Sequence, residues 1–155
     1  MKKRLLYLLV LIILFSCSEH TKSKDKQIGK STAKNVDFKL DVFNSVPDTI
    51  DGCGEYFRLE NENENSDNFI FLSNFTSFAI IKVDGNNVFL EVDSLNSKKI
   101  SKDEYLKIYI GKEYKAILKT KLIEQYDEGG YYEGTLKISN KNSEIEYKVK
   151  GESGC

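Results

Sequence analysis

Apolar and polar residues alternate with a period of two along the C-terminal third of the chain. In residues 144–150 (EIEYKVK), every second position is apolar and the positions between them are charged. The same alternation runs through residues 131–138 and through the longer segment 114–124. Successive side chains of a β-strand point to opposite faces, so each segment predicts a strand with one buried and one solvated face. Three such strands in succession are typical of an antiparallel meander.

A tight hairpin is predicted in the middle of the chain. Residues 76–83 and 88–92 are rich in β-branched and aromatic residues, and they flank the sequence DGNN at residues 84–87. These four residues tolerate the positive φ angles that a tight hairpin requires. Shorter segments rich in Phe, Tyr, Ile and Leu predict three more strands, at residues 38–43, 56–59 and 68–72.

Residues 105–110 fit two patterns. Leu and Ile occupy every second position as in a strand, whereas the preceding sequence SKDE at residues 101–104 matches a helix capping box. We favour a strand, preceded by at most one helical turn. The chain then has about eight or nine strands and no helical periodicity. The fold class expected for residues 36–155 is all-β, a single antiparallel β-sandwich or small barrel of about eight strands.

The N-terminus carries a basic segment, an apolar segment and then a cysteine. Residues 2–4 are basic, and residues 5–15 form an unbroken apolar run of 11 residues. A bilayer span needs about 20 apolar residues, so this run fits a signal-peptide core instead. The sequence LFSC at residues 14–17 resembles the lipobox of bacterial lipoproteins. The resemblance implies cleavage before Cys17, a diacylglycerol on its sulfur and acylation of the new amino group, whereas the alternative is an ordinary secretory peptide.

The residues after Cys17 bear on location and organisation. Ser18 stands where an Asp tends to retain such lipoproteins on the inner membrane, so the resemblance implies the outer membrane, with the leaflet left open. Residues 18–35 are polar, contain five lysines and cannot bury enough surface to order themselves. We expect a flexible tether of roughly 20 to 25 Å, and contact of its lysines with anionic lipid is the less favoured interpretation. The predicted organisation is a signal peptide at 1–16, a lipidated N-terminus and tether at 17–35, and a β-domain at 36–155.

The charges of the chain are nearly balanced. The sequence has 23 Lys and Arg against 24 Asp and Glu, a formal net charge of −1. Lysines alternate with acidic residues along the predicted strands and do not gather in a basic stripe. This pattern argues against nucleic acid as a partner.

Two further cysteines, Cys53 and Cys155, are left if Cys17 is lipidated. An exported protein folds in an oxidising compartment, so we expect a disulfide between them, with free thiols or an intermolecular bridge as alternatives. A metal site is not expected, because no Cys-x-x-Cys motif is present and the single histidine, His20, lies in the tether. The acidic run at residues 60–67 lacks the glycine and the spaced glutamate of a calcium loop, and it predicts a connection between strands. No cofactor is predicted.

The chemistry available to the domain is narrow. Without histidine in residues 36–155, neither a Ser-His-Asp nor a Cys-His arrangement can be assembled there, and we expect no enzymatic activity. The candidate recognition site is a tyrosine-rich turn, because exposed tyrosines offer a large contact area and stack on sugar rings. The alternative is that its rings only cover the end of the sheet. The residues of this turn are Tyr126, Asp127, Glu128, Tyr131 and Tyr132.

These features favour a non-enzymatic envelope lipoprotein, held on a membrane by its lipid, whose β-domain binds a protein or a glycan. The first alternative is a carrier of a lipid-like molecule inside a barrel, because abundant Phe, Ile and Leu can line such a cavity as well as fill a core. The less favoured alternative is a glycosidase that uses a pair of carboxylates.

Overall fold

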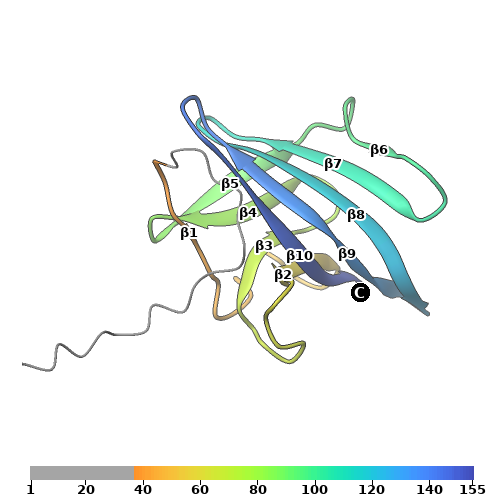
Figure 1. The fold of residues 1–155 in the computed structure, drawn as a ribbon. Helices are drawn as coiled ribbons and strands as arrows, with labels where there is room; N and C mark the ends of the chain where they lie inside the picture. The colour runs from red at the N-terminus through yellow and green to blue at the C-terminus, as the bar shows by residue number, and fades with distance from the viewer. Residues whose placement is uncertain (1–36) are drawn as a thin grey trace, which may run out of the picture.

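The computed structural model describes residues 37–155. All helices and strands assigned in this part of the chain are β-strands (Figure 1). The predicted signal peptide, Cys17 and the tether lie outside the described residues. The strands form one antiparallel sheet that closes into an eight-stranded barrel, with two short strands added at its margins. The strands are β1 Leu40–Asp41, β2 Gly54–Leu59, β3 Phe69–Ser73, β4 Phe78–Val83, β5 Asn86–Val92, β6 Lys98–Lys99, β7 Glu104–Ile110, β8 Lys115–Tyr126, β9 Gly129–Ser139 and β10 Glu144–Gly154.

The barrel is an up-and-down meander. Consecutive barrel strands pair with one another, β5 pairs directly with β7, and β10 returns to pair with β2 from Val149↔Leu59 to Gly154↔Gly54. β1 lies beside the end of β4 and β6 lies beside the start of β7, so neither is part of the closed ring. The sequence left a sandwich and a barrel open, and the pairing of β10 with β2 shows that the domain is a barrel.

Side chains fill the barrel interior. The alternation predicted for the last strand is confirmed, because Ile145, Tyr147 and Val149 are all buried. Aromatic rings also meet inside, with the ring centre of Phe71 5.3 Å from that of Tyr109. Burial of this apolar surface is the main favourable contribution to folding. The largest fully buried residues include Tyr109, Phe57, Phe71, Leu90, Leu118, Leu136 and Ile138.

A second, smaller core lies outside the barrel wall. The segment between β1 and β2 places Phe43 and Ile50 against the outer face of β3 and β4. The Phe43 N–H donates to the Phe69 carbonyl at 2.7 Å, which fixes the start of this segment. β3 is therefore buried on both faces, and this explains why its sequence, FIFLS, is a nearly continuous apolar run without alternation.

The first described residues close one end of the barrel. Phe38 is buried, and its ring meets that of Tyr114 edge-on at 5.3 Å. The Asp37 carboxylate accepts hydrogen bonds from the Ser143 hydroxyl and, at 2.8 Å, from the Asn140 amide. These hydrogen bonds hold the pKa of Asp37 below its ordinary value, and the one from Ser143 has the largest effect. This end is thus covered by one ring and by a cluster of polar contacts.

Towards the opposite end the strands approach one another so closely that several glycines, Gly134 and Gly151 among them, leave no room for a Cβ. A Cβ at Gly134 would lie 1.9 Å from a carbonyl oxygen of the neighbouring strand, and a Cβ at Gly151 would lie 2.1 Å from another. The predicted disulfide joins Cys53 and Cys155 at this end, with their Cα atoms 4.0 Å apart. The disulfide therefore links the start of β2 to the end of β10, the two strands that close the barrel.

Most predicted strands are present with shifted ends. The ambiguous segment forms the strand β7, and the predicted hairpin turn is confirmed, with Asp84 and Gly85 at positive φ angles of 47° and 81°. The strand predicted at residues 38–43 is reduced to β1, because Phe38 turns into the barrel end and Phe43 into the outer core. β6 consists of two lysines and carries no alternation, so no pattern predicted it. Among residues 37–155, the structure has no helix long and apolar enough to cross a membrane.

Candidate functional site

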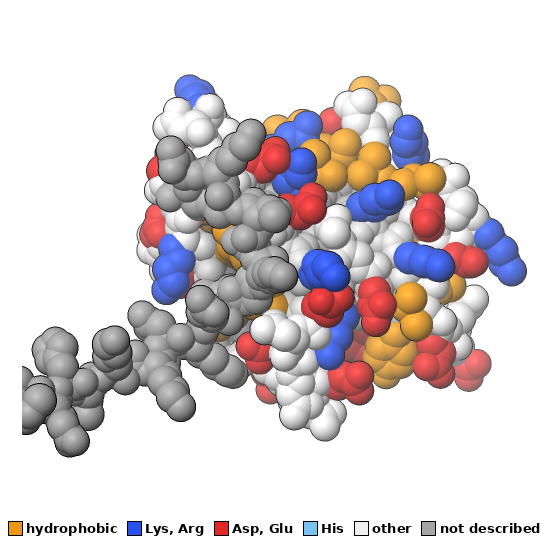
Figure 2. All heavy atoms as spheres, in the orientation of Figure 1, with side chains coloured by type: hydrophobic (Ala, Val, Ile, Leu, Met, Phe, Trp, Pro, Cys, Tyr) orange, Lys and Arg blue, Asp and Glu red, His pale blue; other side chains and the backbone are white. Residues whose placement is uncertain are grey.

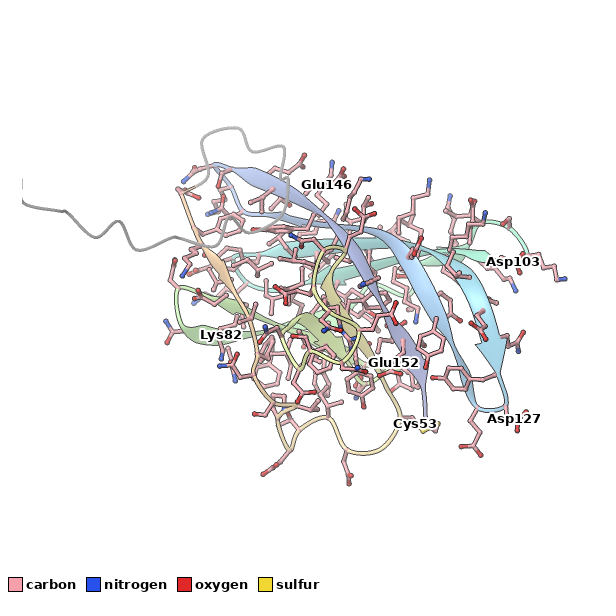
Figure 3. All side chains as sticks on the ribbon, turned by 60° about the horizontal axis from the view of Figure 1, so that its bottom comes forward. Cys53, Lys82, Asp103, Asp127, Glu146 and Glu152 are labelled. Carbon is pink, nitrogen blue, oxygen red and sulfur yellow. A yellow bond between two sulfur atoms is a disulfide. The ribbon has the colours of Figure 1, made fainter. Side chains whose placement is uncertain are left out.

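The tyrosine-rich turn predicted as a recognition site is the hairpin between β8 and β9. Tyr126 and Tyr131 lie on its outer face with their ring centres 5.4 Å apart. Asp127 and Glu128 are exposed at the tip, where Figure 3 labels Asp127. Tyr132 points the other way and packs against the barrel core. The structure therefore brings Tyr126 and Tyr131 together and separates Tyr132 from them.

A groove of about 570 Å³ lies next to Tyr131 on the outer surface of the barrel. Its floor is formed by β9, β10 and β2, one wall by the loop between β2 and β3, and the other by the bulged part of β8. Figure 2 looks onto the outer face of β8, β9 and β10, where acidic and basic side chains are interspersed. The residues that line the groove include Arg58, Glu64, Tyr131, Glu133, Lys150 and Glu152.

Arg58 is held in place on the floor of the groove. Its guanidinium donates to the backbone carbonyl of Glu64 and lies over the ring of Phe69, 5.1 Å from the ring centre. Its Nε is buried and has no hydrogen-bond partner among the described residues. Lys150 lies directly opposite Arg58 in the strand register. The floor therefore presents two adjacent cations, one of which has a donor without an acceptor.

Carboxylates surround these two cations. In the register of β9 and β10, Glu133 lies opposite Lys150, and Glu152, which Figure 3 labels, lies opposite Tyr131. The lining thus contains four glutamates against two cations, so the groove is acidic overall. The other two glutamates are Glu64 and Glu124.

Tyr126 packs against Tyr131, which lines the groove. The Tyr126 hydroxyl occupies the space that a Cβ would need at Gly129 or Gly154, at 2.8 Å from either position. Burial raises the pKa of Tyr126 above its ordinary value, and the nearby Glu152 carboxylate adds a smaller contribution in the same direction. The hydroxyl therefore stays protonated at neutral pH and can donate a hydrogen bond.

A buried ion pair lies inside the barrel, away from the groove. Glu55 is 4% exposed, and its carboxylate accepts hydrogen bonds from the Ser73 hydroxyl at 2.7 Å, the Tyr109 hydroxyl at 3.1 Å and the Lys107 ammonium at 2.7 Å. Burial raises the pKa of Tyr109 above its ordinary value, and the negative charge of Glu55 adds a smaller contribution in the same direction. Both oxygens of Glu55 have donors, so this cluster is satisfied within the protein and acts as part of the core.

The groove suits a ligand that both donates and accepts hydrogen bonds. Its cations donate, its carboxylates accept, and Tyr131 adds a flat apolar face. The acidic loop at residues 60–67 forms one wall of the groove. Within residues 37–155, no three His, Cys, Asp or Glu side chains are grouped in a way that could hold a metal ion.

Sequence reasoning missed Arg58, Lys150 and Glu152. These residues belong to strands that are distant in the sequence and become neighbours only because β10 pairs with β2. Each occupies an outward position of its strand, as many surface residues do, so the alternation alone did not single them out.

Comparison of the chain with protein-family models, with curated proteins and with solved structures found no match. Fold by itself does not specify function, whereas the residues of the groove limit the kinds of ligand that it can bind.

Proposed function

We propose that the domain is a non-enzymatic glycan-binding module, carried outside the cytoplasm on a lipid anchor at Cys17. The observation that carries the glycan part of this proposal is the groove, in which an exposed tyrosine ring lies beside a mixed set of charged donors and acceptors.

Tyr131 supplies the stacking surface. Its side chain is 51% exposed, and Tyr126 packs against it with the two ring planes tilted by 59°. An aromatic face stacks on the C–H face of a sugar ring, and a tyrosine has only two side-chain torsions to immobilise. A ring that is already held by a neighbour loses still less freedom when a ligand binds.

The polar lining matches the hydroxyl groups of a saccharide. A sugar hydroxyl can donate to Glu133 or Glu152 and accept from Arg58 or Lys150. The excess of glutamates over cations favours a neutral or amino-bearing saccharide over an acidic one.

The anchor and the outer-membrane location are parts of the same proposal, and they rest on the pattern of residues 1–18. A lipid at Cys17 would hold the domain beside the polysaccharides of the cell envelope. Two or three acyl chains give stable anchoring, because each buried methylene contributes about 0.8 kcal/mol.

The competing ligands have less support. A lipid-like cargo would need space in the barrel interior, where large side chains such as Phe57, Leu118 and Leu136 already pack together. A protein partner would favour an apolar centre in the binding surface, whereas the groove is lined mainly by charged side chains.

The test is a titration of the isotope-labelled protein with soluble oligosaccharides, followed by NMR. The probes are oligomers of glucosamine, N-acetylglucosamine and glucuronate. We expect shifts at groove residues with the first two probes and weaker ones with the acidic third. Tyr131→Ala should lower the affinity by roughly two- to tenfold, because an aromatic contact contributes about 0.5 to 1.5 kcal/mol, while Tyr131→Phe should keep most of it.

Phe89→Ala is the matched control, since Phe89 is 53% exposed and lies outside the groove. The proposal fails if none of the probes shifts the groove resonances. It also fails if Phe89→Ala weakens binding as much as Tyr131→Ala does.

A further inference from the structure

An apolar strip runs along the outer face of the barrel over β5, β7 and β8. Phe89 is 53% exposed and Ile110 is 46% exposed, and both face outward. Leu106 and Ile108 alternate with the inward residues of β7, and Ile108 lies opposite Ile117 of β8. Figure 2 shows hydrophobic side chains gathered over β7. Exposed apolar side chains grouped on one face in this way are typical of a surface on which another body docks.

The loop before β7 extends this strip. Leu95, between β5 and β6, is 94% exposed, and Ile100, just after β6, is 44% exposed. Figure 1 shows this loop standing beyond β7, and Figure 2 shows hydrophobic side chains at its tip. A leucine so exposed at a loop tip has no packing role within residues 37–155, and it is available to another surface.

Lysines flank the strip on both sides. In the strand register Lys115 lies opposite Ile110, while Lys119 and Lys98 both lie opposite Leu106. Lys121 faces the same way and lies opposite Glu104. The outward face of β5, β7 and β8 thus carries four lysines, and three glutamates share it, namely Glu91, Glu104 and, at the far end of β8, Glu124.

We propose that this strip docks the domain on an anionic phospholipid surface. Apolar side chains bordered by lysines are the pattern of proteins that lie on membranes, because the apolar groups enter the interface and the cations meet the headgroups. Charge complementarity selects lipid over a second copy of this chain, because two copies face to face would bring their lysines together.

The proposed function supplies the reason why a membrane is within reach. A tether of roughly 20 to 25 Å, as predicted for residues 18–35, lets the domain turn and lie on its own membrane. β7 and β2 are four strands apart in the ring of eight, on opposite sides of the barrel. Docking through β7 therefore leaves the Arg58 side of the groove facing away from the lipid.

The test is lysine footprinting of the full chain, purified from producing cells and reconstituted with vesicles of phosphatidylcholine, with or without phosphatidylglycerol. Mass spectrometry then measures how fast each lysine reacts with an amine reagent. We expect Lys98, Lys119 and Lys121 to react more slowly on the anionic vesicles. Lys148, on the outer face of β10 with a 69% exposed side chain, is the internal control and should not change.

Two variants separate the apolar and electrostatic parts. Leu95→Asn should reduce the protection by about tenfold, the effect of losing one buried leucine. Neutralising Lys115 with Lys115→Gln should reduce the protection by about fivefold, since a lysine near an anionic surface contributes about that factor. Leu95 is almost fully exposed, so its replacement leaves the fold intact.

Equal reactivity on both kinds of vesicle would overturn the docking proposal, and so would equal protection of Lys148. Protection that appears without vesicles at high protein concentration would indicate a second copy and would also overturn it. Anchoring through the lipid is measured separately, as flotation of the chain together with the neutral vesicles. A chain that floats with neutral vesicles but shows no lysine protection keeps the anchor and refutes docking alone.

Discussion

The ion pair inside the barrel gives the sharpest test of the structure. Replacing Lys107 by methionine keeps the length and the apolar stem of the side chain but removes the cation that meets Glu55 at 2.7 Å. The Glu55 side chain is only 5% exposed, so water cannot take over from the ammonium. Breaking a buried pair in this way costs about 3 to 5 kcal/mol.

The loss of free energy of unfolding depends on which partner of the ion pair is removed. The Lys107 side chain is 27% exposed, so the expected cost of Lys107→Met lies near the lower end, at about 3 kcal/mol. Glu55→Gln should cost less, about 1 kcal/mol, because the freed ammonium can reach water and the amide oxygen still accepts from Ser73 and Tyr109. The double variant should be more stable than Lys107→Met alone, because it contains no uncompensated buried charge.

The measurement is chemical denaturation of the four proteins of this double-mutant cycle, followed by circular dichroism. Lys119→Met is the control, since Lys119 is exposed on β8 and its replacement should change the free energy of unfolding by less than about 0.5 kcal/mol. The reasoning is refuted if Lys107→Met and Lys119→Met have the same effect. It is also refuted if the two single changes at Glu55 and Lys107 simply add.

Three further predictions follow from the fold and the sequence. Reducing the Cys53–Cys155 disulfide, or replacing both cysteines by serine, should lower the free energy of unfolding by about 4 to 5 kcal/mol, the chain-entropy value for a loop of about 100 residues. Burial raises the pKa of Tyr147 to about 12, so folding disfavours its ionised form and stability should fall as the pH rises from about 10 to 12. Tyr147→Phe should remove that part of the alkaline loss in a spectroscopic pH titration of unfolding, and an unchanged alkaline profile would contradict the assignment. Cys17→Ser should yield a chain without fatty acid that retains residues 1–16, as mass spectrometry of the protein from its native cell would show, and a fatty acid in that variant would contradict lipidation at position 17.

The strands of this barrel were largely predictable because most of them have one wet face. In β10, Ile145, Tyr147 and Val149 face the core while charged residues face water, and no helix could present such a pattern. β3 was predictable only as an apolar run, since it is buried on both faces. The alternation does not predict the closure of the sheet, but the predicted disulfide between Cys53 and Cys155 already indicated that the start of β2 lies beside the end of β10.

The candidate site was predictable in part. Tyr126 and Tyr131 stood out because they lie near a glycine turn, and the alternation already places Tyr131 and Tyr132 on opposite faces. The pair of cations on the floor of the groove could not be predicted from the sequence, because Arg58 and Lys150 become neighbours only through the register of β2 and β10. Their meeting is a property of the closed ring and not of either segment alone.

The buried Glu55 left a faint signal in the sequence. It is in phase with Phe57 and Leu59 along β2, so the alternation places a carboxylate among inward-facing apolar residues. Its partner, Lys107, comes from a strand on the far side of the ring. A polar residue in the apolar phase of a strand therefore indicates an internal partner, but only the fold identifies it.

The meander has a consequence for the order in which the chain assembles. Seven of the eight barrel contacts join strands that follow one another, so they close short loops and form quickly, whereas the contact of β2 with β10 joins residues about 90 to 100 positions apart. We expect this seam to form last in the reduced chain. Once Cys53 and Cys155 are oxidised, the two edges are held together and any later unfolding and refolding no longer requires a long-range search. We therefore expect oxidation of this cysteine pair to make the last step of assembly a local one.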